Sequence, residues 1–151
     1  MQKISELLAP SAIVLDLKAK EKIEAIKELA NVLIEQGIVN DTDEFFSAIL
    51  RRENLESTGI GFGVAIPHAR TKAVKDIVLA FGRSRNGVDF SSLDGKPSHL
   101  IFLIAAPDEK KSEYIITLAR LSKILRNEAI RVQLNRAKSA EEVITIITQN
   151  E

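Results

Sequence analysis

Between Ser57 and Ala69 the chain reads Ser-Thr-Gly-Ile-Gly-Phe-Gly-Val-Ala-Ile-Pro-His-Ala, with three glycines at alternating positions. Glycine alternating with bulky residues is typical of extended or turning backbone that approaches another group closely. Pro67 has a restricted φ and biases Ile66 toward extended geometry, so His68 follows a stiff element at a defined angle. The segment therefore predicts a displayed imidazole preceded by closely spaced backbone N–H groups, which favour an anion such as a phosphoryl group.

The glycines could instead belong to a nucleotide-binding loop or a hydrolase elbow. The segment matches none of the three known motifs of this kind. A Walker loop needs Gly-Lys-Ser/Thr after its glycines, and a hydrolase elbow needs Gly-x-Ser-x-Gly; neither is present. The dinucleotide fingerprint opens a helix, whereas Gly63 is followed by Val-Ala-Ile-Pro. His68 is then either a nucleophile at neutral pH or a residue that packs or caps a strand end, and chemistry alone leaves both open.

The sequence on either side predicts one layered α/β domain over residues 1–151. Three helices are expected in the last third, and earlier elements follow from periodicity: strands at 12–17, 76–82 and 99–106, and helices at 20–36 and 41–52. Because strand, two helices, several strands and three helices follow one another, we expect a mixed central β-sheet with helices on both faces. A doubly wound dinucleotide fold needs a regular alternation that is lacking here.

Composition excludes several classes of protein. Lys plus Arg and Asp plus Glu each number 21 in 151 residues, so no net field draws the chain to nucleic acid or an anionic membrane. The absence of cysteine removes disulfides, thiol catalysis and thiolate zinc sites, and is compatible with a reducing cytosol. Glu6 interrupts any signal core, and the longest apolar run, Leu100–Ala106, is too short to span a bilayer. We expect a cytoplasmic protein with no metal site.

A longer pattern around His68 resembles a known family. Glu53, Ile60-Gly61 and Val64-Ala65-Ile66-Pro67-His68-Ala69 resemble the signature of phosphotransferase-system enzyme IIA domains of the fructose/mannitol class, which includes the nitrogen-regulatory IIA proteins. The resemblance covers nearly the whole chain, and its other segments are Ile4-Ser-Glu-Leu-Leu, Arg51-Arg-Glu-Asn-Leu-Glu-Ser-Thr, Asp94-Gly95-Lys96-Pro97 and Leu118-Ala-Arg-Leu-Ser.

The resemblance implies a phosphoryl carrier that uses no cofactor. The histidine at the position of His68 accepts a phosphoryl group on Nε2 from the phosphocarrier protein HPr or a nitrogen-branch equivalent. It then passes the group to a cysteine on a IIB domain or keeps it as a regulatory signal. Positioning and charge stabilisation carry such a transfer.

The resemblance also assigns roles to residues near His68. Arg52 stands where the family has an arginine beside the phosphohistidine, although Arg51 and Arg52 are also favourable as a solvated helix end. Ser57 and Thr58 are expected either to donate hydroxyls to the phosphoryl oxygens or to make local turn bonds. Tyr114 takes the place of a second histidine that members often carry; it either donates a hydrogen bond there or packs against the sheet.

Partner recognition is expected to use an apolar rim around His68, with Ile60, Phe62 and Val64 as its residues. His99, at the start of a strand, is expected to be a structural hydrogen-bonding group rather than a second catalytic histidine. Three functions stay open: a nitrogen-type regulatory carrier, a fructose or mannitol transport component, and a binding module of the same fold that turns over no phosphate. Tyr114 is the feature that favours the last.

Overall fold

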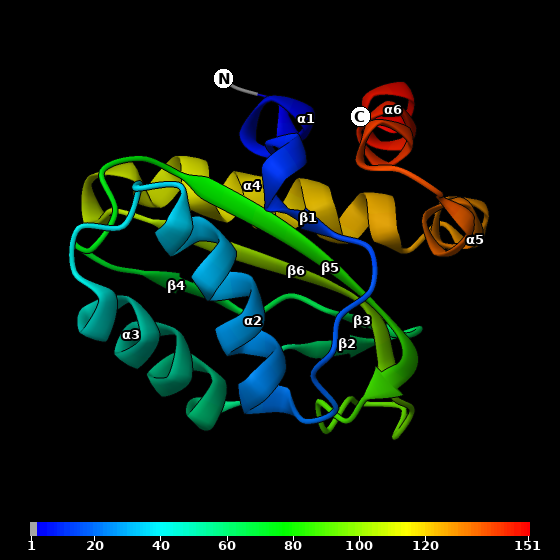
Figure 1. The fold of residues 1–151 in the computed structure, drawn as a ribbon, viewed down its shortest axis with the longest axis horizontal. Coiled ribbons are helices and arrows are strands. Elements are labelled where there is room, and N and C mark those ends of the chain that lie inside the picture. The colour runs from blue at the N-terminus through cyan, green and yellow to red at the C-terminus, as the bar shows by residue number, and fades with distance from the viewer. Residues whose placement is uncertain (1–2) are drawn as a thin grey trace.

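The computed structural model describes residues 3–151, and the elements follow the predicted order (Figure 1). The helices are α1 (Ile4–Leu7), α2 (Lys22–Glu35), α3 (Thr42–Leu55), α4 (Lys111–Leu125), α5 (Glu128–Arg136) and α6 (Ala140–Asn150), with short 3₁₀ turns at Pro10–Ala12 and Asp108–Lys110. The strands are β1 (Ile13–Val14), β2 (Gly59–Gly61), β3 (Val64–Ala65), β4 (His68–Arg70), β5 (Val78–Val88) and β6 (Ser98–Ala106).

The six strands form one mixed sheet, which confirms the predicted architecture. Its order is β1-β5-β6-β3-β2, and β4 pairs with β6 beyond the end of β3. β5 and β6 are antiparallel, as are β2 and β3, whereas β1 runs parallel to β5 and both β3 and β4 run parallel to β6. Two short strands thus pair with the long central strand β6: β3 along its first half and β4 along its second half.

Helices cover both faces of the sheet. α2 and α3 lie in front of it in Figure 1, and α4 lies behind it with α5 and α6 continuing toward the C-terminus. The front face is tightly packed at Gly82, where an added Cβ would lie 2.7 Å from Leu17 and 2.8 Å from Leu29. On the opposite face, the rings of Phe81 and Phe102 pack 4.5 Å apart between centroids. The core therefore lies in two layers, one on each side of the sheet.

Two strands differ in length from the prediction. β1 is restricted to Ile13–Val14, because a 3₁₀ turn ends at Ala12 just before it and the chain bends at residues 15–16 just after it. β5 continues past the predicted end at Gly82 to Val88, through the polar residues Arg83, Ser84 and Arg85. Arg83 and Ser84 are buried there, so the strand continues through polar residues that belong to the interior.

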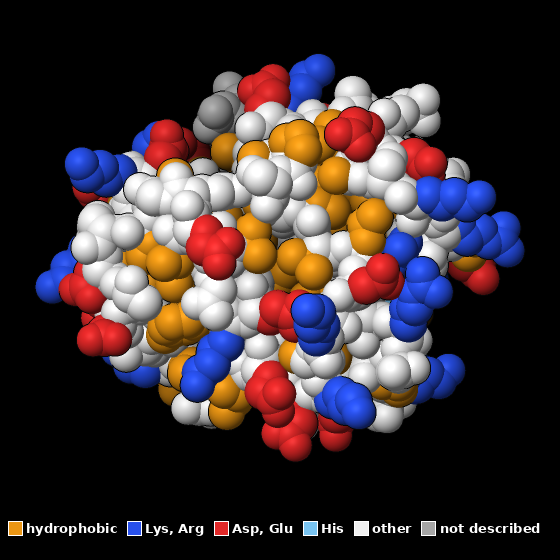
Figure 2. Space-filling view, in the orientation of Figure 1, with side chains coloured by type: hydrophobic (Ala, Val, Ile, Leu, Met, Phe, Trp, Pro, Cys, Tyr) orange, Lys and Arg blue, Asp and Glu red, His pale blue; other side chains and the backbone are white. Residues whose placement is uncertain are grey.

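Charged side chains of both signs are interspersed over the face shown in Figure 2, with apolar side chains between them. This distribution agrees with the net charge of zero. Within residues 3–151, every helix is too short or too polar to cross a membrane.

Candidate functional site

His68 is the first residue of β4, which has β6 as its strand neighbour. It pairs in register with Ile104, and the two peptide units before and after β4 are also anchored: Ile104 N–H donates to the Pro67 carbonyl and Thr71 N–H donates to the Ala106 carbonyl. The ring is half-buried. The extended geometry predicted for the residue before Pro67 thus delivers the imidazole to a short strand that, within residues 3–151, pairs on one side alone, with β6.

One ring nitrogen of His68 is already occupied. Nδ1 lies 2.6 Å from the Ile66 carbonyl oxygen, and because a carbonyl only accepts, Nδ1 carries the proton in this contact. In the neutral ring this leaves the lone pair on Nε2. A backbone bond two residues upstream therefore selects both the tautomer and the orientation of the imidazole.

The surroundings of His68 favour its neutral form. Burial lowers the pKa of the imidazole below its usual value of 6.5, the hydrogen bond to Ile66 raises it, and the positive charge of Arg52 lowers it further while Glu53 raises it. A lowered pKa keeps the ring unprotonated, and hence nucleophilic, at neutral pH.

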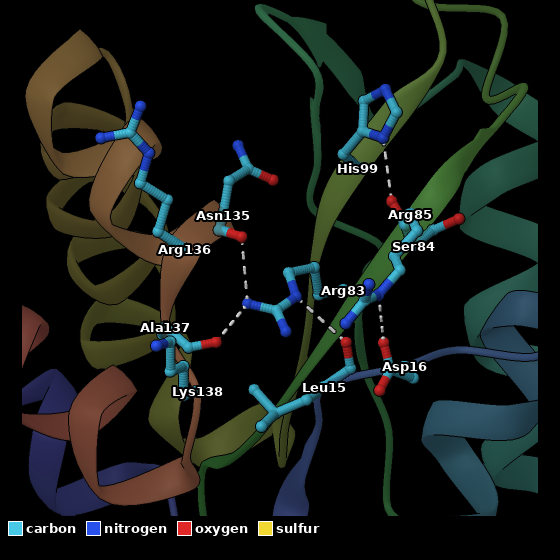
Figure 3. Close-up of a pocket in the computed structure, with 10 residues that line it drawn as sticks. All are labelled: Leu15, Asp16, Arg83, Ser84, Arg85, His99, Asn135, Arg136, Ala137 and Lys138. Carbon is cyan, nitrogen blue, oxygen red and sulfur yellow. Dashed lines mark hydrogen bonds and ion pairs between the residues drawn. The ribbon is translucent and has the colours of Figure 1, made fainter.

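The second histidine lies at the opposite end of β6 and has a structural contact. His99 Nδ1 is 2.8 Å from the Ser84 carbonyl oxygen on β5, and the ring borders a different cavity (Figure 3). This arrangement agrees with the expectation that His99 is a hydrogen-bonding group at a strand start. Within residues 3–151, no three His, Asp or Glu side chains gather as a metal-ligand set.

A shallow groove of about 570 Å³ lies between α3 and the start of α4. Ala69, Arg70 and Tyr114 line it and place it next to His68, which is not itself among the lining residues. Cationic side chains dominate its lining: Arg51 and Arg52 from α3 and Arg70 from β4 outnumber one carboxylate, Asp108, whose Oδ1 lies 3.9 Å from Arg70 Nη1. The Arg52 Nη1 donates to the Glu56 carbonyl at 2.7 Å, which also caps the end of α3, as the alternative interpretation of this residue expected. The positive charge of Arg52 nevertheless contributes to lowering the pKa of His68, and its side chain borders the groove.

Tyr114, on the first turn of α4, packs against His68. The two ring centroids are 6.0 Å apart with an interplanar angle of 53°, and Tyr114 is only 8% exposed. Burial raises the pKa of Tyr114 to about 12, although the charges of Arg52 and Arg70 act in the opposite direction. The phenol is therefore a neutral hydrogen-bond donor at any physiological pH, and it both packs and borders the groove.

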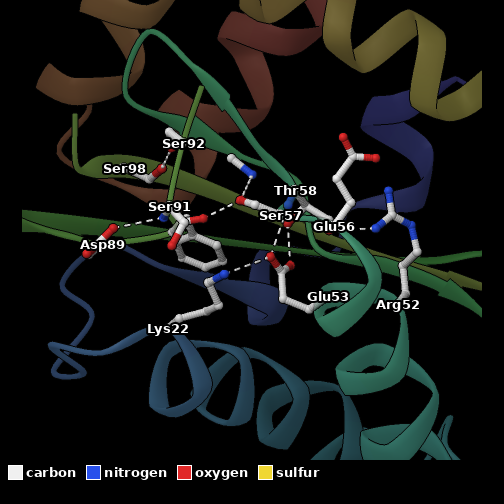
Figure 4. A network of polar contacts seen from close by, with 12 residues as sticks. Lys22, Arg52, Glu53, Glu56, Ser57, Thr58, Asp89, Ser91, Ser92 and Ser98 are labelled. Atoms are coloured by element: carbon white, nitrogen blue, oxygen red, sulfur yellow. Dashed lines mark hydrogen bonds and ion pairs between the residues drawn. The ribbon is translucent and has the colours of Figure 1, made fainter. Parts of the chain in front are cut away.

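The loop before β2 is held by a buried carboxylate (Figure 4). Glu53 accepts from the Thr58 hydroxyl at 2.5 Å and from the Thr58 N–H at 3.0 Å, and its Oε2 lies 3.1 Å from Lys22 Nζ. The Ser57 hydroxyl donates to the Phe90 carbonyl and accepts from Gly59 N–H. Both hydroxyl protons are thus committed to protein acceptors, which matches the turn interpretation of Ser57 and Thr58.

The predicted apolar rim is not assembled around His68. Val64 is fully buried in β3, so the prediction that it contacts a partner is wrong. β3 pairs with β6 at Leu100, four residues before the partner of His68, which separates the two sites by about 13 Å along the strand. Phe62 lies still farther along that hairpin, so its placement beside His68 is also wrong, although it is 62% exposed.

The cause lies in the turn between β2 and β3. Phe62 has a left-handed φ of 59°, and its N–H donates to the Asp94 carboxylate at 3.0 Å. Its ring lies under the Arg131 guanidinium at 4.9 Å. Ile60, on β2, is half-buried against the core. The alternating glycines therefore make a hairpin that leads away from His68.

Two features of the groove were missed in the sequence. Arg70 lies two residues after His68 on the same strand, so strand alternation puts both side chains on one face. This spacing could have predicted Arg70 as a residue of the site. Leu55, at the end of α3, is 83% exposed and borders the groove. No sequence pattern predicts that Leu55 borders the groove, because the exposure of one apolar residue at a helix end depends on which residues pack around it.

Comparison with known proteins gives consistent matches over the whole chain. The profile of the phosphoenolpyruvate-dependent sugar phosphotransferase system EIIA 2 family matches residues 6–150. The fructose-specific EIIABC component of Bacillus subtilis is 47% identical over 149 residues, which are 99% of this chain but only 24% of that protein. The chain therefore spans about a quarter of the length of that relative.

Solved structures share the fold. The crystal structure of nitrogen regulatory protein IIA-Ntr from Neisseria meningitidis matches with a TM-score of 0.89 at 38% identity, over 95% of this chain and 98% of that one. The IIAMTL complex with phosphorylated enzyme IIBMTL from Escherichia coli matches with a TM-score of 0.81 at 26% identity, over 95% and 99% of the two chains.

The Glu53 network predicts a large loss of stability on substitution. We expect Glu53→Ala to lower the free energy of unfolding by about 3 kcal/mol, because the Thr58 N–H and hydroxyl lose their acceptor inside the protein. Glu44→Ala, which removes the ion pair of Glu44 with Arg51 on the same helix, is the control and should cost less than about 1 kcal/mol. Urea unfolding measures both. Equal losses would show that the buried network does not hold the loop.

The lowered pKa of His68 predicts a pH-dependent stability. The unfolded chain binds a proton near pH 6.5, at higher pH than the folded chain, so protonation favours unfolding. The wild-type free energy of unfolding should therefore fall below pH 6.5, by at most about 1.4 kcal/mol per pH unit from this group. Urea unfolding of wild type and His68→Gln between pH 7.5 and 5 tests this. Parallel pH curves for the two proteins would contradict it.

Proposed function

The chain belongs to the EIIA 2 family of the phosphoenolpyruvate-dependent sugar phosphotransferase system, and on that basis we propose that it carries a phosphoryl group on Nε2 of His68. The observation that supports this most is the bond from Nδ1 to the Ile66 carbonyl, which leaves the Nε2 lone pair free. We propose one EIIA domain over residues 1–151.

The transfer needs one nucleophile and no proton movement at His68. The Nε2 lone pair forms a bond to phosphorus while the bond from phosphorus to the donor's leaving atom breaks, and that electron pair stays with the donor. Nδ1 keeps its proton and its bond to Ile66 throughout. In the second half, an acceptor thiolate attacks phosphorus and the bond to Nε2 breaks, which restores the neutral ring.

Arg52 and Arg70 are proposed to stabilise the phosphoryl oxygens. Both border the groove beside His68, and both act electrostatically on Tyr114, which packs on the imidazole. A guanidinium offers two parallel N–H donors, a geometry that suits phosphoryl oxygens. Tyr114 supplies a neutral O–H where many family members have a second histidine. In this proposal Arg70 provides the positive charge that Tyr114 lacks.

The partners follow from the family and the surface. We propose an HPr-type phosphocarrier as donor and a IIB domain as acceptor, or a regulatory protein that senses the phosphorylated state. The groove offers such a partner cationic side chains together with the exposed Leu55. Small, partly polar surfaces of this kind suit transient carrier encounters. Relatives named for fructose and for nitrogen regulation both match, so either downstream role suits the proposal.

Phosphorylation in a reconstituted system tests the proposed function. With enzyme I, HPr and phosphoenolpyruvate, the wild type should gain the mass of one phosphoryl group in a form that is labile in acid and stable in base. His68→Gln should gain none, because the glutamine amide is not a nucleophile. His99→Gln is the matched control and should be labelled like the wild type.

Retention of the fold by His68→Gln, measured by circular dichroism, makes the loss of labelling interpretable. Absence of labelling in wild type with HPr and with its nitrogen-branch equivalent would instead favour the non-catalytic binding module. Labelling of His68→Gln at the wild-type level would remove His68 from the proposal.

Substitution of the two arginines tests the charge stabilisation. Arg70→Met and Arg52→Met should each slow phosphorylation by HPr about tenfold or more, since a hydrogen bond to a charged group is worth about 1.5–3 kcal/mol. Arg120→Met, on the exposed side of α4, removes the same charge outside the groove and should leave the rate within twofold. Quenched-flow labelling at matched protein concentrations gives these rates. An unchanged rate for Arg70→Met would contradict the proposal that Arg70 supplies the positive charge that Tyr114 lacks.

A further inference from the structure

A second cavity, of about 500 Å³, lies at the other end of the sheet from His68, between β1, β5 and the α5–α6 junction (Figure 3). Its volume is in the range of small-molecule sites. Arg83, Arg85, Arg136 and Lys138 line it with one carboxylate, Asp16, so the lining carries an excess of three positive charges. Lys and Arg side chains are also seen gathered at the edge of the molecule over α5 (Figure 2).

Arg83 lies at the centre of this cavity and is only 6% exposed. Its Nε donates to the Leu15 carbonyl at 3.0 Å, and its Nη1 donates to three carbonyls at the end of α5, the closest being that of Ala137 at 2.6 Å. Nη2 has no hydrogen bond to any acceptor within residues 3–151. Since no fully buried side-chain nitrogen there lacks a partner, solvent must reach Nη2 through the cavity.

The charge of Arg83 has no counterion in the described part of the chain. All its acceptors are neutral carbonyls, and no carboxylate lies within 4.0 Å of the guanidinium. The one acidic residue of the lining, Asp16, is engaged by Arg85 at 2.8 Å. Arginine is seldom buried to this degree without an acidic partner. The cavity thus presents a rigid N–H donor and unpaired positive charge to whatever enters it.

We propose that this cavity is a noncovalent binding site for a small multivalent anion, either a phosphate ester or a polycarboxylate. The Arg83 Nη2 would donate to the anion at the base of the cavity, and Arg136 and Lys138 would supply charge at its mouth. Because Arg83 is held by the backbone carbonyl just after β1 and by those at the end of α5, its orientation needs no ordering on binding. The net charge of zero over the whole chain argues for a small anion rather than a nucleic acid.

The site is separate from His68. Arg83 pairs in register with Leu100 on β6, whereas His68 pairs with Ile104, so the two lie about 13 Å apart along this strand. Alternation puts both side chains on the face of the sheet that α4 and α5 cover. The proposal therefore holds for the unphosphorylated protein and does not depend on transfer through His68.

Titration of the unphosphorylated, ¹⁵N-labelled chain with inorganic pyrophosphate and, separately, with citrate tests the site by NMR. We expect saturable shifts of the Ser84, Ala137 and Lys138 amides, and the anion with the lower Kd identifies the class. The double variant Arg136→Ala/Lys138→Ala should raise that Kd tenfold or more. Its control, Lys123→Ala/Arg126→Ala, removes two exposed charges elsewhere on the helical face and should change the Kd less than twofold.

Arg83→Met should abolish the shifts, but it also removes a donor from four carbonyls, of which only that of Leu134 keeps another, the Ala137 N–H. The surface double variant is therefore the deciding test. Anion binding at the groove beside His68 is read separately from the Ala69 and Arg70 amides and should not respond to Arg136→Ala/Lys138→Ala. The proposal is overturned if neither anion shifts the Ser84 and Ala137 amides. It is equally overturned if the two double variants weaken binding to the same extent.

Discussion

The parallel pairing of β4 with the far half of β6 is the interaction on which the site depends. Three residues of β4 are bound in register to Ile104, Ala105 and Ala106, and the peptides on either side of them are anchored to the same strand. This pairing places His68 on a strand whose one neighbour in the described part of the chain is β6, and the ring there is half-buried. Pro67, which biases Ile66 toward extended geometry, lies between the two partners of the bond from Nδ1 to the Ile66 carbonyl.

Polar residues near His68 divide into a scaffold and a charged groove. Glu53, Ser57 and Thr58 satisfy one another and the backbone, so they shape the loop that leads into β2. Arg52 and Arg70 border the groove, where Tyr114 packs on the imidazole as a neutral group. Although its net charge is zero, the chain has a cationic groove beside His68 and a cationic cavity around Arg83, toward opposite ends of β6.

Much of the architecture was predictable because local pattern and tertiary environment agree. The apolar faces of α2 and α3 and the apolar run of β6 face the core as their periodicity indicates. The pattern failed where polar residues are buried: β5 extends through Arg83 because the guanidinium finds carbonyl acceptors on α5, which is distant in sequence. It failed again at Val64 and Phe62, because nearness to His68 in sequence was taken for nearness in space, and the hairpin leads the other way.

Residue order alone was sufficient for the mixed α/β class and the helix positions, since periodicity is a local property of the chain. The residues around His68 left open whether it reacts or only packs, and the role of phosphoryl acceptor came from the family resemblance and stays a prediction. Which side chains surround that imidazole depends on contacts between segments far apart in sequence. Arg70 reaches the groove by strand alternation, Tyr114 by the packing of α4 on the sheet, and Arg83 faces its cavity by the docking of α5. Such placements are set by side-chain packing in three dimensions, which no short stretch of sequence encodes by itself.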